Sequence, residues 1–450
     1  MNKAPEKMSL LEKISYGCGN MGLCLVTTII TTFIMYFYTD VVKISLLQVG
    51  TIMMVGGIAD AISDLALGIL VDKTNTRWGK ARPYLLIFSV PLAVACFFVF
   101  RVPDASESVR YAYAMVTYLI YTLAYTCICI SQNVLMASIT NDPKDRLGTN
   151  MFGSLGTNIG QLIPNAFALT LVAVLGKGSE YNGYGRTAIV FGVIGALLIL
   201  TDFKFTNERC NPPAGEKITL KDTFHAFKNL PWLISTVTTL LTIVIVVIRA
   251  STTVYFTENV LQAPEMASKL LSISNIIAIP ITLVIPFLAS GIGKRNLVLI
   301  GGGMGVLGSA GIFLFKSNLM VVMVLSVLIS VGIALPNGVV YVMAAESIDY
   351  GEWKFKKRVQ GSLMAFVGFA VKVSNSIATM IISAILNAGG YVGGAETQTA
   401  SAVKAIEFNY LGLPMILFTV VIIANLFYTL DKKYPQIKAD LDERHKSIAA

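Results

Sequence analysis

The chain has 450 residues, of which 55% are hydrophobic and only 14% are charged, and its mean hydropathy is +0.69. A soluble core cannot absorb this much apolar sequence, so the composition excludes a set of soluble domains and indicates a membrane protein. The formal net charge of +9 does not indicate nucleic acid, because most of the basic residues lie between apolar stretches, in the asymmetric distribution that orients membrane proteins.

Apolar stretches of roughly 20 residues, the length that crosses a bilayer, follow one another along the chain. They form two sets of six around the longest internal polar segment. We therefore expect an N-terminal half at 1–203, a central loop at 204–231, a C-terminal half at 232–430 and a tail at 431–450, a plan typical of secondary transporters. The twelve predicted transmembrane helices of this all-α membrane protein lie at 14–38, 46–70, 83–101, 111–136, 148–175, 185–203, 232–257, 266–290, 296–315, 318–345, 361–388 and 407–429.

The first stretch follows Lys3, Lys7 and Lys13 and has no small-residue cleavage pattern after it, so we expect it to be retained and not removed as a signal. Most Lys and Arg residues lie in segments that are cytoplasmic if the N-terminus is cytoplasmic. This asymmetry predicts a multi-pass protein of the inner membrane with both termini in the cytoplasm. We expect it to function as a monomer that contacts the lipid bilayer and no nucleic acid.

Cysteines and histidines give no sign of a disulfide or metal framework. Five of the six cysteines lie in predicted spans, and His225 and His445 lie in a polar loop and in the tail. The sequence has no P-loop, nucleophile elbow or glycine-rich dinucleotide turn. We therefore expect a protein that is not an enzyme and that has neither a metal nor a cofactor, apart from a coupling ion, H+ or Na+.

Asp60 and Asp64 lie four residues apart in the predicted span 46–70, so they share one helical face at membrane depth. An acid there costs about 2.5–3.5 kcal/mol and usually handles an ion or a polar solute. Both carboxyls cannot stay ionised at low dielectric without a counter-charge, so one holds a proton or a cation bridges them. The alternative is a pair satisfied by hydroxyls or by a basic residue of another helix.

Two basic residues also lie within spans. Lys372 is deep in the span 361–388, where it would pair with Asp60 and Asp64, bind the substrate, or form a purely structural ion pair. Arg249 lies nearer the outer end of the span 232–257, where it either contacts the substrate or extends to the interface.

Two blocks of sequence are distinctive. The first runs through Phe37-Tyr38-Thr39-Asp40-Val41-Val42, Asp60-Ala61-Ile62-Ser63-Asp64 and Arg77-Trp78-Gly79-Lys80-Ala81-Arg82-Pro83, and the second through Asp349-Tyr350-Gly351-Glu352-Trp353-Lys354 with Arg358, Gly361 and Lys372. With these blocks the chain resembles the glycoside-pentoside-hexuronide:cation symporters, the melibiose-carrier group of the major facilitator superfamily. The run Asn75 to Lys80 and the tail Leu430-Asp431-Lys432-Lys433 look closest to the glucuronide-transporter branch.

The resemblance implies the major facilitator fold, with Asp60 and Asp64 binding the coupling cation and Lys372 near the site. The chain departs from the melibiose carrier at positions where that protein has sugar-binding acids, an arginine and tryptophans; here these positions are Cys24, Cys129, Asn150 or Met151, Asn133 and Asn337. A thiol is a poor ligand for a hard alkali cation, so Cys129 in place of an acid favours proton over sodium coupling.

We thus predict a secondary active symporter that imports a sugar or glycoside, such as a glucuronide or pentoside, by alternating access. Alternatives are a lipid or lysolipid carrier of the same fold and a non-transporting sensor. The predicted substrate-binding residues are Lys372, Asn20, Cys24, Cys129, Asn133, Asn150, Arg249 and Asn337. The predicted gating residues, which would form ion pairs near the inner face that hold the outward-facing state and break on opening, are Asp72, Arg77, Lys80, Arg82, Asp349, Glu352 and Arg358. The alternative is that these charges only orient the chain in the membrane and solvate its tail.

Overall fold

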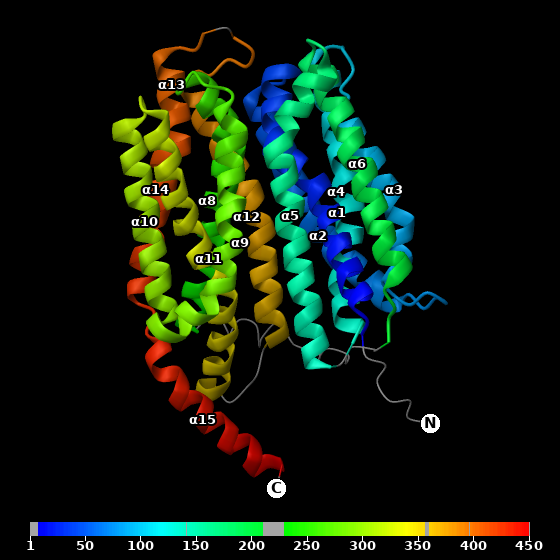
Figure 1. The fold of residues 1–450 in the computed structure, drawn as a ribbon, viewed down its shortest axis with the longest axis vertical. Helices are drawn as coiled ribbons and strands as arrows, with labels where there is room; N and C mark the ends of the chain where they lie inside the picture. The colour runs from blue at the N-terminus through cyan, green and yellow to red at the C-terminus, as the bar shows by residue number, and fades with distance from the viewer. Residues whose placement is uncertain (1–7, 141, 210–228, 356–359, 396, 450) are drawn as a thin grey trace. The chain divides into compact units, whose positions relative to one another are not determined.

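The computed structural model describes residues 8–140, 142–209, 229–355, 360–395 and 397–449, and their regular secondary structure is helical (Figure 1). Apolar runs of this length become helices because a bilayer offers no partner for backbone N–H and C=O groups. The helices are α1 (Leu10–Tyr36) with the π-helix η1 (Phe37–Val41), α2 (Leu46–Lys73), α3 (Arg82–Val99), α4 (Glu107–Ser138), α5 (Pro143–Gly176), α6 (Glu180–Phe205), α8 (Leu230–Asn259), α9 (Met266–Ile292), α10 (Lys294–Phe315), α11 (Leu319–Phe355), α12 (Gln360–Ala388), α13 (Ala400–Glu407) with η2 (Phe408–Gly412), α14 (Leu413–Leu426) and α15 (Leu430–Ala449).

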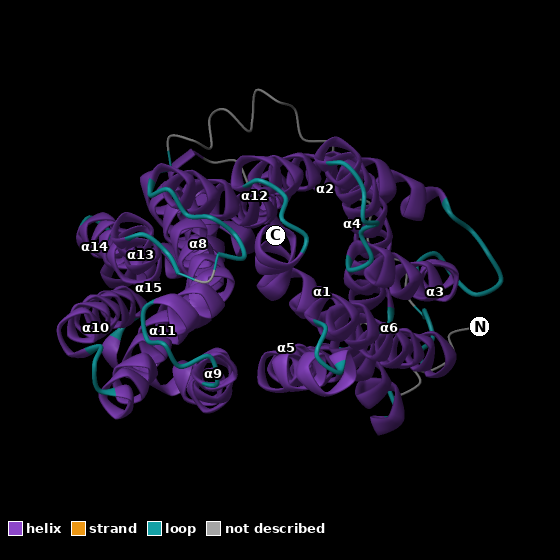
Figure 2. Ribbon diagram, turned by 90° about the horizontal axis from the view of Figure 1, so that it is seen from above, coloured by secondary structure: helices purple, strands orange, loops and turns teal. Residues whose placement is uncertain are grey.

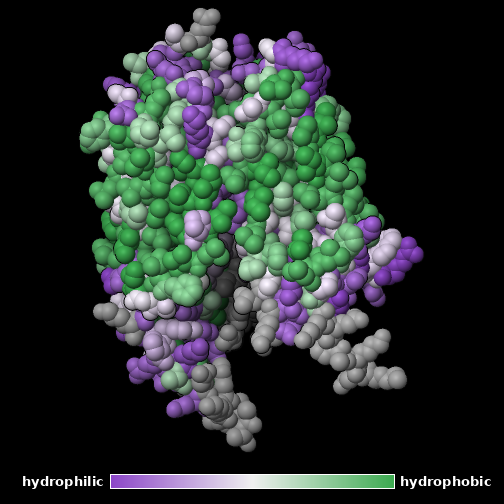
Figure 3. All heavy atoms as spheres, viewed as in Figure 1, coloured by the Kyte–Doolittle hydropathy of each residue, from purple (hydrophilic) through white to green (hydrophobic). Residues whose placement is uncertain are grey.

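Twelve helices in the described residues are long and apolar enough to cross a membrane, which confirms the predicted number. In the space-filling view of Figure 3, hydrophobic residues cover the sides of the helices and hydrophilic residues gather at their ends, as a bilayer requires. The tenth span is longer than its apolar run suggested, because it continues past residue 345 to Lys354. The tail is also more ordered than a solvated segment, since it forms α15.

Contacts group the chain into two compact units. Unit 1 comprises Met1–Pro213, Thr253–Asn275 and Thr379–Ala405, and unit 2 comprises Ala214–Thr252, Ile276–Ala378 and Ile406–Ala450. Unit 1 therefore contains the first six spans together with two short segments from the second half of the sequence. The division into halves at residues 204–231 stays a prediction.

In unit 1, α1 packs against both α5 and α6 (Figure 2). The α1–α5 contact is backbone against backbone, because a Cβ added at Gly156 would lie 2.0 Å from the carbonyl oxygen of Gly17. Small residues permit such close approach in membranes, where dispersion contacts and not the hydrophobic effect hold helices together. The helix α3 packs against α4 and α6 at the edge of this group.

In unit 2, α10 packs against α11 and α14 (Figure 2), around a core that includes Val298, Met343 and Tyr428. The tail helix α15 packs against α11. Its apolar residues Leu430, Ile437 and Leu441 belong to the same core. The hydroxyl of Tyr434 donates to Asp349 at 2.8 Å and Trp353 Nε1 donates to Asp440 at 2.8 Å, so the end of α11 is joined to α15 by two polar contacts.

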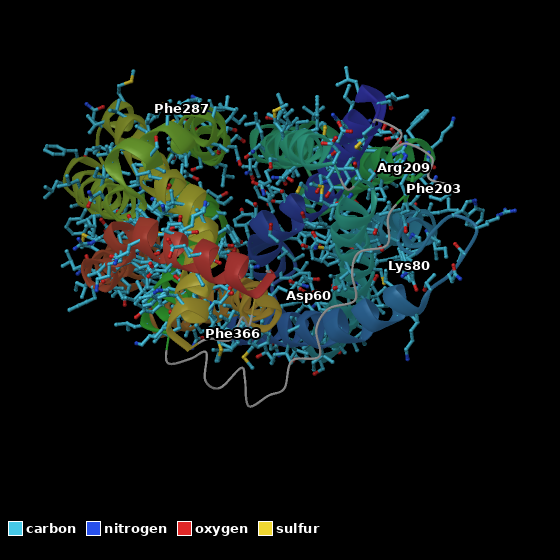
Figure 4. The ribbon with its side chains drawn as sticks, turned by 90° about the horizontal axis from the view of Figure 1, so that it is seen from below. Asp60, Lys80, Phe203, Arg209, Phe287 and Phe366 are labelled. Atoms are coloured by element: carbon cyan, nitrogen blue, oxygen red, sulfur yellow. The ribbon has the colours of Figure 1, made fainter. Side chains whose placement is uncertain are left out.

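The loop between α2 and α3 is fixed to the end of α6 by contacts that we call the first clamp, made by Gly79, Lys80, Ala81, Arg82, Phe203 and Glu208. The Glu208 carboxylate accepts the backbone N–H groups of Lys80 (2.8 Å), Ala81 (2.8 Å) and Arg82 (3.0 Å) at the start of α3. In return, Arg82 Nη2 and Nε donate to the carbonyl of Phe203, at 2.7 and 3.2 Å. Figure 4 labels Lys80 and Phe203 at this end of unit 1. Glu208 thus satisfies backbone N–H groups at the start of α3, and Arg82 satisfies a backbone carbonyl at the end of α6.

The same device recurs in unit 2 as the second clamp, made by Gly293, Lys294, Arg295, Asn425, Leu426 and Asp431. Asp431 accepts the backbone N–H of Arg295 at 2.7 Å, at the start of α10. Arg295 Nε and Nη2 donate to the carbonyls of Asn425 (3.0 Å) and Leu426 (2.9 Å), at the end of α14. The recurrence follows the sequence, since each clamp joins the third span of a set of six to the residues after the sixth.

Candidate functional site

Asp60 lies on α2, on the side that faces α4, and is only 9% exposed (Figure 4). The hydroxyl of Thr126 on α4 donates to Asp60 Oδ1. Ser63 Oγ donates to the backbone carbonyl of Asp60 at 3.0 Å and lies 3.5 Å from Thr126 Oγ1. The Asp60 carboxyl therefore has a hydroxyl partner from a neighbouring helix within the membrane-spanning part of unit 1.

Asp64 is half-buried one turn further along α2, so the two acids share a face, as their spacing predicted. Three tyrosines of α4 continue this polar region. The rings of Tyr118 and Tyr121 lie 5.9 Å apart, and those of Tyr121 and Tyr125 lie stacked at 6.3 Å. A Cβ at Gly56 would collide with the Tyr118 ring at 2.2 Å, so the tyrosine ladder packs directly on α2.

The predicted substrate residues of α1 face α5. Asn20 donates from Nδ2 to the carbonyl of Tyr16 at 3.0 Å. A Cβ at Gly153 of α5 would lie 3.5 Å from that amide nitrogen, and one at Gly160 would lie 2.8 Å from the Cβ of Cys24. Both side chains are half-buried, so they lie along the α1–α5 contact and not on an outer surface.

On α4, Cys129 is half-buried and Asn133 is exposed, with Asn133 Nδ2 at 3.9 Å from Cys129 Sγ. Asn150, on α5, is exposed. The substrate-binding role of these three residues stays a prediction.

In unit 2, Arg249 is 7% exposed and does not extend to solvent. Its guanidinium lies 4.4 Å from the ring centroid of Tyr410 in η2, and Nη2 donates to the Tyr410 hydroxyl at 2.9 Å. This arrangement is a cation–π contact with a shared hydrogen bond. Lys372 on α12 and Asn337 on α11 are half-buried, and the pairing of Lys372 with Asp60 and Asp64 stays a prediction.

The predicted gating residues fall into two groups. Lys80 and Arg82 belong to the first clamp, and the Arg77 guanidinium lies over the neighbouring Trp78 ring at 4.4 Å. Asp349 accepts the hydroxyl of Tyr434, and Glu352 is 9% exposed. Arg358 and the side chain of Asp72 lie outside the described residues. The hydrogen bonds of Arg82 and Asp349 described above each lie within one unit, and a gating role for any of these residues stays a prediction.

The profile of the MFS/sugar transport protein family matches residues 15–432. The chain belongs to this family. Its recognition as a glycoside-pentoside-hexuronide type of major facilitator symporter is thereby confirmed, as is the all-α fold. The family and the relatives below are transporters, and the twelve spans make the chain a multi-pass membrane protein.

Curated relatives extend over nearly the whole chain. It is 33% identical to the isoprimeverose transporter of Lactiplantibacillus pentosus, over 96% of this chain and 91% of the relative. It is 27% identical to the putative glycoside/cation symporter YagG of Escherichia coli (97% and 95% covered) and 26% identical to the glucuronide carrier protein homolog of the same species (98% and 97%). Among solved structures, a D-xylose-proton symporter matches with a TM-score of 0.66 at 13% identity, covering 94% of this chain and 98% of that one, which shows the fold alone.

Sequence reasoning missed the residues that contact the predicted ones. It did not find Thr126, because a hydroxyl in an apolar span carries no signal until the facing helix is known. Ser63 was part of a recognised block, but its contact with the Asp60 carbonyl was not foreseen. Glu208 and Asp431 follow the sixth and twelfth spans, and a search for acids at matching places in the two halves would have found both.

Proposed function

We propose that the protein is a symporter that imports a sugar or glycoside together with a proton, by alternating access. The observation that carries this proposal is Asp60, an acid at membrane depth whose carboxylate contacts the Thr126 hydroxyl. An acid in this position is costly unless it handles an ion, and the relatives are named as symporters and carriers of sugars.

We favour H+ over Na+ as the coupling ion because Cys129 stands where the melibiose carrier has an acid, and a thiol is a poor ligand for a hard alkali cation. The Thr126 hydroxyl, which also donates to the carbonyl of Thr122 at 2.8 Å, gives Asp60 a neutral hydrogen-bonding neighbour. In the proposed cycle, Asp60 and Asp64 take up a proton before the sugar crosses.

The tyrosine ladder and the half-buried amides suit a polyhydroxylated substrate. Tyr125, which is half-buried and stacked on the buried Tyr121, offers a ring for stacking, while Asn20 and the Cys24 thiol lie on α1. The names of the relatives suggest an isoprimeverose-like glycoside or a glucuronide as the first substrates to test. The excess of basic residues in the segments that would face the cytoplasm supports a cytoplasmic location for both termini.

The test is uptake of labelled isoprimeverose and of a labelled glucuronide into vesicles under an imposed proton or sodium gradient. We expect accumulation with the proton gradient only. Asp60→Asn, which cannot take up or release a proton, should abolish accumulation while leaving counterflow. Thr126→Val should weaken the coupling less.

The matched control is Asp104→Asn, which removes an exposed acid from the loop between α3 and α4. Equal uptake with and without either gradient would exclude coupling altogether. Accumulation that follows the sodium gradient alone would replace the proton with sodium as the coupling ion.

A further inference from the structure

At the end of α1 furthest from the N-terminus, Asp40 in η1 collects three hydrogen-bond donors. Tyr391 donates its hydroxyl to Asp40 Oδ1 at 2.6 Å, and the backbone N–H of Gly394 donates to the same oxygen at 3.0 Å. The hydroxyl of Thr39 donates to Oδ2 at 2.6 Å. Two of these donors come from the segment Thr379–Ala405, so Asp40 ties the first span to a loop some 350 residues later in the chain (|i−j| = 351 and 354).

Two further contacts join the same end of α1 to α8. Thr39 Oγ1 lies 2.7 Å from the Tyr255 hydroxyl, and Tyr36 donates to Glu258 Oε1 at 3.0 Å. The Tyr255 ring meets Tyr36 edge-on at 5.6 Å and Tyr391 edge-on at 5.5 Å. Asp40, Thr39 and the three tyrosines therefore form one connected network, which lies entirely within unit 1.

Most side chains of the network are buried, while Asp40 itself is half-buried and Gly394 is exposed. Tyr255 is fully buried, and Thr39 and Tyr391 are 2% and 7% exposed. A Cβ added at Gly393 would lie 2.1 Å from the carbonyl oxygen of Thr39, so the loop backbone rests directly on η1. Burial and the nearby Asp40 raise the pKa of the Tyr391 hydroxyl, which keeps it protonated as a donor. The π-helical turn of η1 is a feature that recurs at functional sites.

We propose that Asp40 is a positioning residue that latches the outer end of the transporter shut, by holding the Tyr391–Gly394 loop against α1. This inference rests on the proposed function, because alternating access requires the outer end to open and close. A latch of this kind suits a reversible step. It consists of a few polar contacts around one carboxylate, and these can be exchanged for water when the segments separate, whereas an apolar seal of the same area would resist wetting.

Ser383 on α12 offers a position that reports opening. It belongs to the same Thr379–Ala405 segment, is 1% exposed, and its Oγ would lie 2.9 Å from a Cβ at Gly50 of α2. If the segment moves away from α2, this side chain becomes accessible. Ser383→Cys changes one atom, so it places a thiol there with little disturbance.

The experiment measures labelling of Ser383→Cys by a charged, membrane-impermeant maleimide added to right-side-out vesicles, with the otherwise native chain subtracted as background. Adding Asp40→Asn should raise the labelling rate about tenfold, because the amide oxygen can still accept from both loop donors but lacks the negative charge that makes such hydrogen bonds roughly twice as strong, and Thr39 loses its acceptor. Tyr391→Phe, which removes one donor and keeps the acid, should raise it about threefold.

Three controls make the result decisive. Glu265→Gln removes an exposed acid from the loop between α8 and α9 and should leave the rate unchanged. Ser138→Cys, 1% exposed at the opposite end of α4, should label equally with and without Asp40→Asn in inside-out vesicles, where the reagent reaches that end, since only a general loosening of the fold would expose it. In inside-out vesicles, Asp40→Asn should not increase the labelling of Ser383→Cys.

Rates for Asp40→Asn and Tyr391→Phe that match Glu265→Gln would overturn the latch. A rise seen only in inside-out vesicles would also overturn it, because the network would then open to the cytoplasm. The labelling does not depend on transport. If uptake fails under every gradient while labelling rises as expected, the proposed function fails and the latch stands; the reverse result rejects the latch alone.

Discussion

The two clamps occupy corresponding places in the two sets of six spans, yet they are stabilised by different interactions. In the first clamp, the Glu208 carboxylate accepts three backbone N–H groups of α3. In the second, Asp431 accepts one N–H and its other oxygen lies 4.0 Å from Lys294 Nζ, which also pairs with Glu346 of α11 at 3.1 Å. The first clamp thus relies on a helix N-terminus, and the second on side-chain charges.

The two clamps thus fix equivalent helix ends in the two sets of six spans, but they do so with different interactions. Each clamp satisfies the free N–H groups at the start of its third helix and the free carbonyls at the end of its sixth. A carboxylate at a helix N-terminus does this with fixed backbone groups, whereas an ion pair between side chains is screened by salt and costs side-chain entropy. The first clamp should therefore be the stronger and the less sensitive to salt.

Removing the carboxylate of the first clamp should lower the free energy of unfolding more than any other substitution considered below. Glu208→Ala leaves three N–H groups without their acceptor, and we expect a loss of about 3 kcal/mol in the free energy of unfolding. Asp431→Ala removes one such bond and a weak ion pair, for about 1–2 kcal/mol. Thermal unfolding in detergent measures both. Glu208→Gln is the matched control, since its carbonyl oxygen keeps two of the three bonds. Equal losses for the two alanine variants would contradict the comparison.

A second test uses the first glycine of each clamp. Gly79 has φ of +104° and a Cβ there would lie 2.5 Å from the Glu208 carboxyl carbon; Gly293 has φ of +88° and its Cβ would lie 3.3 Å from Asp431. Both alanine variants strain the backbone, but only Gly79→Ala also displaces the carboxylate. We expect losses of about 2–3 and about 1–2 kcal/mol respectively. A double variant with Glu208→Ala should recover part of the first loss, which identifies the clash.

The fold could be predicted from the sequence because its main signals are local. Hydrophobic length fixed the number of spans, and the acid pair at Asp60 and Asp64 was visible as charge inside an apolar run. The helical tail was not predicted, because its residues Leu430, Ile437 and Leu441 form an apolar face only when α11 is beside them.

The contacts of the site were harder to predict than its acids. Thr126 lies in a different helix from Asp60, and nothing in the sequence relates the two. Asp40 belongs to a distinctive sequence block, but its proposed role depends on Tyr391 and Gly394, which are more than 350 residues away in sequence. Pairings of this kind are set by tertiary packing, so a single sequence contains them only implicitly.

Substituting the clamp arginines by lysine should destabilise the second clamp more than the first, which is the reverse of the order expected in the first two tests. Arg82 directs Nε and Nη2 to one carbonyl, that of Phe203, whereas Arg295 serves the separate carbonyls of Asn425 and Leu426. Arg82 also donates from Nη1 to Asn207 Oδ1 at 3.1 Å, in an exposed position. A lysine ammonium can keep the Phe203 contact and lose only this exposed bond, but it cannot span the two carbonyls that Arg295 serves. We expect Arg295→Lys to cost about 1.5 kcal/mol and Arg82→Lys about 0.5–1 kcal/mol in thermal unfolding. A larger loss for Arg82→Lys would show that its carbonyl contacts are not what the first clamp depends on.

The smallest effect separates the clamps by their response to salt. Lys294→Met removes the ion pairs with Glu346 and Asp431. The side chains of Lys294, Glu346 and Asp431 are 18%, 11% and 18% exposed. We expect a loss of about 0.5–1 kcal/mol in dilute buffer that falls to about half in 1 M salt, where charges are screened over roughly 3 Å. Lys80→Met is the matched control, because the Lys80 ammonium forms no ion pair with the residues that the structure describes and the first clamp uses its backbone N–H. Its thermal unfolding should match that of the native chain at both salt concentrations. A salt-dependent loss at Lys80, or none at Lys294, would mean that the two clamps do not differ in the way their contacts indicate.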